Sequence, residues 1–197
     1  MRTSDGIRLN VVTAGAGANV VVLSHGVTGT KEDLYGLATA FVRDGWRAIA
    51  YDARGVGDSS GSPDLGARDL DLRAVVEYAR RSGARTLVLA GGSLGAALSI
   101  AMAQPLHADA VVSLSAPRTS YDAIAAAEAI GSSIPALVVA SAGNQPFADD
   151  ARALATALGV TPVIVSGSRH GTGVFVDHPE LKARIVRFAD EAVRTIA

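Results

Sequence analysis

The segment TLVLAGGSLGAALSIA, residues 86–101, places a serine between glycines at the end of an apolar run. Its centre, GGSLG, fits the pattern G-x-S-x-G with Ser93 in the middle. TLVLA is typical of a strand and LGAALSIAMA of a helix, and a serine at such a sharp strand-to-helix turn exposes its hydroxyl. The helix N-terminus beside it would also stabilise negative charge. We therefore predict that Ser93 is a nucleophile rather than only a helix cap, because a cap would leave the flanking glycines unexplained.

A nucleophilic serine needs a base, and His170 in SGSRHGTG has the most suitable position. It follows the last predicted strand, where a neutral imidazole could take the serine proton and return it to a leaving group. The remaining histidines fit less well. His25 precedes the serine, His107 leads into a strand from the opposite side of the sheet, and His178 abuts a proline. We predict His170 as the base in preference to a solvated loop histidine.

Acyl chemistry at a serine also needs two backbone N–H groups that point at one developing oxyanion. The N–H of Leu94, directly after the serine, is the first candidate. The second is Val27, in the loop SHGVTGT that follows an apolar run. His25 and Gly26 in the same loop are compatible with an ordinary tight turn, and we expect them to border the substrate as well.

The elements that must position these loops alternate along the whole chain. Apolar, β-branched runs predict strands at 7–13, 19–24, 47–52, 85–90, 109–115, 135–141 and 161–167. Amphipathic, Ala-rich stretches predict helices at 32–44, 67–82, 94–104, 119–130, 148–158 and 179–195. The nearly continuous apolar character of most strands indicates burial on both faces of a parallel sheet. We predict one doubly wound α/β domain over residues 1–197, with its crevice at the carboxyl ends of the strands.

Composition limits the partners. The chain has 197 residues, 49% of them hydrophobic, and a formal net charge of -1 without a Lys/Arg cluster. Nucleic acid and anionic membranes are therefore not expected to bind. There are no cysteines, which excludes disulfides and thiol chemistry, and no metal-ligand cluster or cofactor motif is evident. We therefore expect no cofactor. The N-terminus lacks the apolar run of a signal peptide, so we expect a cytoplasmic protein. The sequence leaves the oligomeric state open.

Four segments, in order and spacing, resemble the α/β-hydrolase superfamily: SHGVTGT, YDARGVGDS, GGSLG and SRHGTG. The resemblance covers nearly the whole chain. Members commonly hydrolyse esters, thioesters, lactones or amides through a Ser-His-Asp/Glu triad. The resemblance implies Ser93 as nucleophile, His170 as base, and the amides of Val27 and Leu94 as oxyanion donors. It gives YDARGVGDS a mainly structural role. A dehalogenase of this superfamily would need aspartate at position 93.

The acid of the triad departs from the superfamily pattern. Aligning LVVASAGNQPFADDARAL on the usual strand, loop and helix puts Asn144 in the acid position, or Gln145 if the loop shifts by one residue. Asp149 or Asp150 could reach back to His170 instead, although both also suit the start of a helix. In serine proteases the corresponding Asp→Asn change lowers turnover about ten-thousandfold. We favour Asn144 in this position, natural or engineered. It would slow the triad, or mark a site that has changed toward binding or toward a reaction that tolerates an amide.

The connection between the predicted strands 109–115 and 135–141 is about one helix long, which leaves no room for a lid. The crevice should therefore be open and suited to small or extended acyl groups. In this it resembles dienelactone-hydrolase-like proteins and small carboxylesterases. Arg118 could meet a substrate anion at the rim, and Tyr121 and Phe147 could form apolar walls. The resulting hypothesis is a serine hydrolase acting on a small-molecule acyl substrate, and the alternative is a catalytically silent ligand-binding protein.

Overall fold

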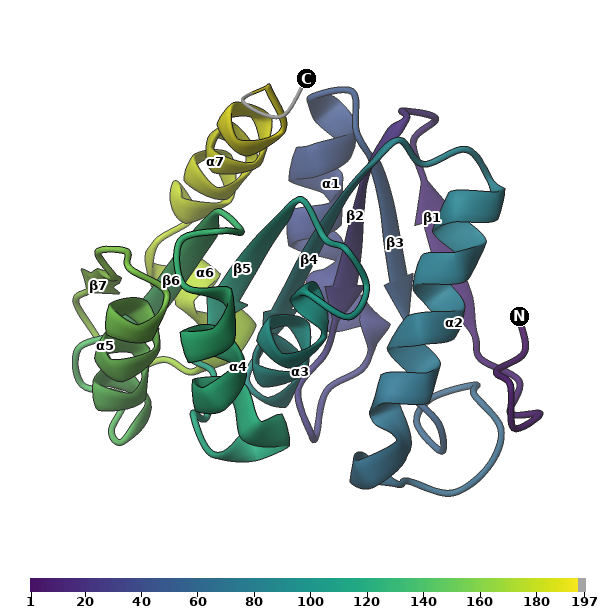
Figure 1. Ribbon diagram of the computed structural model, residues 1–197, viewed down its shortest axis with the longest axis horizontal. Helices are drawn as coiled ribbons and strands as arrows, with labels where there is room; N and C mark the ends of the chain where they lie inside the picture. Colours follow the sequence, from purple (N-terminus) through teal and green to yellow (C-terminus); the bar gives the residue numbers. More distant parts are fainter. Residues whose placement is uncertain (195–197) are drawn as a thin grey trace.

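A single twisted sheet organises the computed structural model, which describes residues 1–194 (Figure 1). Within these residues, seven strands lie in the order β1-β3-β2-β4-β5-β6-β7. The strands are β1 Val11–Ala14, β2 Asn19–Ser24, β3 Arg47–Tyr51, β4 Thr86–Gly92, β5 Ala110–Leu114, β6 Ala136–Ser141 and β7 Val163–Val165. Only β1 runs antiparallel to its neighbour, β3, and the other pairs are parallel.

Helices cover both faces of the sheet (Figure 1). They are α1 Tyr35–Arg43, α2 Arg68–Arg81, α3 Leu94–Ala103, α4 Ala123–Ile130, α5 Phe147–Ala157, α6 Val174–Asp177 and α7 Leu181–Arg194. Short 3-10 helices cover Lys31–Leu34, Leu65–Ala67, Ser120–Asp122 and Gly171–Gly173. Helices α2 to α5 pack on one face, and α1 and α7 pack on the other. None of the helices described is both long and apolar enough to cross a lipid bilayer.

The core consists of two apolar layers, one on each face of the sheet. Successive residues of β2 alternate between them, with Val20 and Val22 in the layer under α2 and α3, and Val21 and Leu23 in the layer under α1 and α7. All four side chains are fully buried. A strand covered on both faces has no face exposed to water, which explains why its sequence is apolar throughout. The predicted doubly wound, mostly parallel α/β fold is confirmed.

The N-terminal strand was predicted at 7–13 but lies at 11–14. The backbone before it pairs with the loop after β3 rather than with a strand. The N–H groups of Arg8 and Asn10 donate to the hydroxyls of Ser60 and Ser59, each at 2.8 Å, and their carbonyls accept from the Ser60 and Asp52 N–H groups. These serines come from the loop after β3. Alternating apolar residues could not reveal that a distant loop would replace the strand partner.

Helix boundaries also differ from the expectation in places. The predicted helix 32–44 is a 3-10 turn followed by α1, and 119–130 is interrupted at Tyr121, whose φ of 52° is not helical. The last helix begins at Leu181, residue 195 lies outside the described residues, and α6 was not predicted. Pro146 precedes the first residue of α5, so Asp149 lies within the first turn rather than at the cap. A carboxylate there still interacts favourably with the helix dipole.

Candidate active site

The serine turn joins the end of β4 to the start of α3. Ser93 has φ 55° and ψ −121°, a backbone conformation that residues other than glycine rarely adopt. Its N–H donates to the Leu114 carbonyl at 2.8 Å, which fixes the turn to β5. A Cβ on Gly91 would collide with the backbone of Gly95, and a Cβ on Gly95 would collide with the Ser24 carbonyl. Gly91 and Gly95, on either side of the strained serine, are therefore required by close packing.

His170 lies in the loop after β7, directly against this turn. Its Nε2 is 2.7 Å from Ser93 Oγ, within hydrogen-bond distance. Gly171, with φ +55°, follows the histidine, and a Cβ there would lie 3.6 Å from the Ser93 nitrogen. That distance is ordinary van der Waals contact, so it is the left-handed φ of Gly171, rather than lack of space, that favours glycine here.

The side chain on the far side of the imidazole is that of Asn144. Its Oδ1 lies 2.8 Å from His170 Nδ1. Asn144 is held in the loop after β6, where its N–H donates to the Ser141 carbonyl and its own carbonyl accepts from the Ala148 N–H. The aligned position, rather than the following exposed glutamine, therefore meets the imidazole.

The two aspartates considered as alternative acids point to arginines. Asp149 pairs with Arg152 at 2.8 Å. Asp150 accepts from Arg118 Nε at 3.2 Å and from the Arg118 N–H at 3.3 Å. Within residues 1–194, the hydrogen bonds of the His170 imidazole go to Ser93 and Asn144 and to no carboxylate.

This arrangement sets the tautomer and the basicity of His170. If Asn144 Oδ1 accepts, the proton resides on Nδ1, and Nε2 is free to accept from the Ser93 hydroxyl. The Phe147 ring lies against the imidazole, with centroids 4.1 Å apart. Burial lowers the pKa of His170 below its usual value of 6.5. A neutral amide at Nδ1 leaves that loss of hydration without an opposing charge.

The two amides expected to hold an oxyanion flank the serine. Gly26 packs against it so closely that a Cβ there would lie 3.3 Å from Ser93 Cβ. Val27 follows on an exposed part of the loop, and Leu94 begins α3. In the part of the chain that the structure describes, neither the Val27 nor the Leu94 N–H donates to another backbone carbonyl or side chain. Both donors are thus available to a ligand.

His25 holds this loop from below. It is buried, its Nε2 accepts from the Ala53 N–H at 3.0 Å, and its Nδ1–H donates to the Gly26 carbonyl at 2.6 Å. Burial lowers the pKa of His25, which favours the neutral ring that these two hydrogen bonds require. The side chain predicted to border substrate therefore has both ring nitrogens committed to the protein.

A buried ion pair that the sequence analysis missed anchors the same loop at its other end. Lys31 Nζ lies 2.7 Å from Asp52 Oδ2, and the Lys31 N–H donates to Asp52 Oδ1 at 3.0 Å. Asp52 is fully buried at the end of β3, and the hydrogen bond that it accepts from Lys31 raises the pKa of that lysine. The only sequence signal was the aspartate in YDARGVGDS, for which a structural role was expected.

A cleft of about 350 Å³ opens over Ser93. The residues that line it come from the loops after β2, β4 and β7: His25, Gly26, Val27, Thr28, Gly29, Asp33, Leu34, Gly92, Ser93, His170, Gly171 and Thr172. Of these, Thr28, Asp33 and Thr172 are polar side chains that the sequence analysis did not single out.

Three residues expected at the rim lie outside this lining. Arg118 pairs with Asp150, and the Tyr121 hydroxyl donates to the Leu65 carbonyl at 2.7 Å. Phe147 contacts the imidazole rather than the open space over the serine. The expectations for Arg118 and Tyr121 assumed that every loop at this edge faces the cleft.

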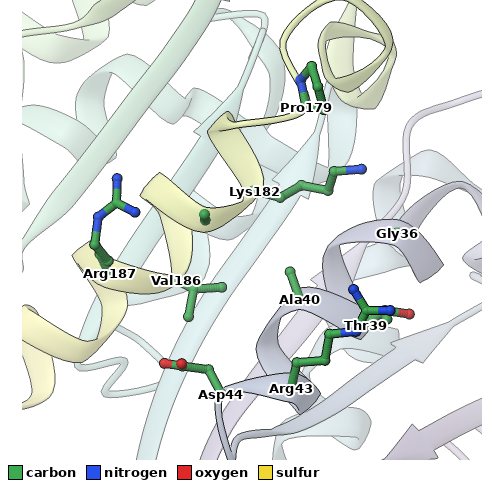
Figure 2. Close-up of a pocket in the computed structure, with 10 residues that line it drawn as sticks. Gly36, Thr39, Ala40, Arg43, Asp44, Pro179, Lys182, Val186 and Arg187 are labelled. Carbon is green, nitrogen blue, oxygen red and sulfur yellow. The ribbon is translucent and has the colours of Figure 1, made fainter.

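A second hollow, of about 450 Å³, lies between α1 and α7, away from the serine (Figure 2). Figure 2 shows that its charged groups diverge: Lys182 and Arg43 extend to one side, whereas Arg187 and Asp44 point to the other. Groups that point apart do not converge on one ligand atom. This hollow therefore lacks the convergent groups that surround Ser93.

No helical lid covers the cleft from the connection between β5 and β6, which holds only the 3-10 turn Ser120–Asp122 and α4. A doubly wound sheet with a strained serine at the turn after a central strand defines the class of α/β-hydrolase-type proteins. The family model described as "alpha/beta hydrolase fold" matches residues 19–168. The chain belongs to the α/β hydrolase fold family, as a small member without a lid.

Solved structures with the same fold include esterases. The esterase Pf2001 of Pyrococcus furiosus superposes with a TM-score of 0.84 at 16% identity, over 96% of this chain and 90% of that one. XC6422 of Xanthomonas campestris, described as a serine hydrolase without a lid, gives 0.73 at 22% identity, over 95% and 88%. Est1E of Butyrivibrio proteoclasticus, solved with ferulic acid bound, gives 0.81 at 18% identity, over 96% and 97%. No curated protein matches the chain in sequence. At these identities the likeness concerns the fold alone.

Proposed function

We propose that this protein is a serine hydrolase that cleaves a small carboxylic ester, thioester or lactone by acyl transfer. The observation that carries the proposal is the 2.7 Å contact between Ser93 Oγ and His170 Nε2, at a strained serine turn that opens into a cleft. A hydroxyl and a neutral imidazole in this geometry are the parts of an activated nucleophile. The esterases among proteins of the same fold are consistent with it.

In the proposed mechanism, Ser93 Oγ attacks the substrate carbonyl while its proton moves to His170 Nε2. The carbonyl electrons move onto the oxygen, which the Val27 and Leu94 N–H groups hold. The carbonyl re-forms as the leaving group departs with the proton from His170 Nε2, so the imidazole is neutral again. Water then attacks the acyl-serine with His170 as base, and Ser93 Oγ leaves with that proton as the acid is released. Asn144 keeps the imidazole in the tautomer with its proton on Nδ1.

The substrate class follows from the cleft. Its volume of about 350 Å³ lies at the lower end of ligand sites, and it is open rather than roofed by a lid. We therefore propose a small or extended acyl substrate and no cofactor. The rim has no free cation for a substrate carboxylate within the described lining, since Arg118 is paired elsewhere.

The test measures hydrolysis of p-nitrophenyl acetate by the natural chain, Ser93→Ala and the exposed control Ser62→Ala. Labelling by a fluorophosphonate probe is followed by mass spectrometry. We expect Ser93→Ala to lose both hydrolysis and labelling, and Ser62→Ala to keep both. Undiminished hydrolysis by Ser93→Ala would refute the proposal.

A second candidate is a ligand-binding protein without catalysis. Asn144 favours it, because an amide stabilises an imidazolium poorly. This alternative would be supported if the natural chain does not hydrolyse p-nitrophenyl acetate and its Ser93 is not labelled by the fluorophosphonate probe.

A further inference from the structure

We propose that the site uses acyl groups carried on good leaving groups, namely thioesters and aryl or enol esters, in strong preference to alkyl esters and amides. The inference rests on the proposed function and deepens it by naming the substrate class. It is carried by the contact of His170 Nδ1 with an amide oxygen, that of Asn144, where a carboxylate would otherwise stabilise the charged imidazole.

The surroundings of His170 hold no compensating negative charge in contact with the ring. Its described neighbours are Ser93, the Asn144 amide and the Phe147 ring. The nearby carboxylates of Asp149 and Asp150 are turned to arginines. Burial also lowers the pKa of His170. Each step that must create or rely on an imidazolium is therefore more costly than in a triad with a carboxylate.

The leaving group decides how much acylation depends on the imidazolium. When the bond from carbon to the leaving atom breaks, the electron pair goes to that atom. An alkoxide or amide anion must receive the proton from His170 Nε2 as it leaves. A thiolate or phenolate can leave as the anion, and His170 loses its proton to water afterwards. The corresponding acids have pKa values of about 8.5 for a thiol and about 10 for a phenol, against about 15.7 for water, which an alkanol resembles.

Hydrolysis of the acyl-serine meets the same difficulty with every substrate. Water attacks the carbonyl, its proton passes to His170, and the bond to Ser93 Oγ breaks. The departing serine oxygen is an alkoxide, so it needs that proton back. Acylation by an activated ester should thus be faster than deacylation. The acyl-enzyme should then accumulate, and its formation should be seen as an initial burst of released phenol or thiol.

The experiment compares S-ethyl thioacetate, phenyl acetate and ethyl acetate, which share one acyl group. Values of kcat/KM are measured for the natural chain, Asn144→Asp and the control Gln145→Glu. The control adds the same charge at an exposed neighbouring residue that does not contact the imidazole. We expect Asn144→Asp to raise kcat/KM for ethyl acetate about a hundredfold more than for phenyl acetate. Gln145→Glu should leave the ratio of the two substrates unchanged.

Equal gains on both esters, or the same change in ratio from Gln145→Glu, would overturn the inference while leaving the hydrolase proposal intact. Inertness of every chain toward all three substrates, with no fluorophosphonate labelling, would overturn both. If Asn144→Asp does not fold, the natural chain decides alone. A burst of about one phenol per protein molecule from phenyl acetate supports the inference, and linear release from the first turnover overturns it.

Discussion

The buried pair of Lys31 and Asp52 should be worth far more than an ordinary surface ion pair. Lys31 is 6% exposed and Asp52 0%. In Lys31→Met, the Asp52 carboxylate keeps the Lys31 N–H as a hydrogen-bond donor but loses its cation. Removing one partner of a buried pair costs about 3–5 kcal/mol, which is a large part of the roughly 5–15 kcal/mol that stabilises a whole protein. At about 2–4 °C per kcal/mol in a chain of this size, Tm should fall by about 10 °C.

The assay is urea unfolding, with kcat/KM on p-nitrophenyl acetate measured under native conditions. We expect activity to fall with stability, because Lys31 follows the loop that holds Val27. Neutralising both partners, in Lys31→Met with Asp52→Asn, should recover part of the loss, since no unpaired buried charge remains and Glu32, the second partner of Lys31, is exposed to solvent. Arg81→Met removes an exposed partner of Glu77 and should cost at most about 0.5 kcal/mol. A loss below about 1 kcal/mol for Lys31→Met would refute the reasoning.

Three further perturbations test the site. Burial lowers the pKa of His170, so the fall of kcat/KM on the acid side of the pH profile should lie below pH 6.5. Asn144→Asp should move that fall upward by about 1 pH unit or more. An unchanged pH profile would contradict the contact between residue 144 and the imidazole. Asp33 carries the one carboxylate in the described cleft lining. Asp33→Asn should therefore lower the preference for a choline ester over a neutral ester about two- to fivefold, and 1 M salt should suppress this effect. A change that does not depend on salt would argue against an electrostatic role for Asp33. Gly95→Ala forces a Cβ into the carbonyl at the end of β2 and should destabilise the fold by about 1–3 kcal/mol in urea, whereas Gly36→Ala, which meets only a flexible lysine side chain, should not.

The alternation of strands and helices could be predicted because it depends on local signals, and the placement of Ser93 and His170 at one edge of the sheet followed from the parallel arrangement. Apolar runs identify strands buried on both faces, and parallel strands bring their carboxyl ends to one edge. A serine between glycines at that edge needs little else to be singled out. The place of Asn144 was expected from the resemblance to the superfamily, with Gln145 as the alternative if the loop shifted by one residue.

The residues that sequence missed depend on partners far along the chain. Nothing around Lys31 indicates that it meets Asp52, and the role of His25 requires the Ala53 N–H beneath it. Arg118 was expected to face the substrate because it follows a strand end at the edge of the crevice, and the sequence shows no partner for its charge. Only the packing of α5 shows that Asp150 engages it.

The glycine contacts around Ser93 have a consequence for how such a protein can be altered. Gly26, Gly92, Gly95 and Gly171 bring the backbones of three loops, those after β2, β4 and β7, into contact with one another around the serine turn. A change in any of these backbones must be accommodated by the other two, so the centre of the cleft can vary only if several substitutions arise together. Laboratory evolution toward new substrates should therefore find its single-step gains at the outward side chains, such as Thr28 and Thr172, while the ring of backbone beneath them stays unaltered.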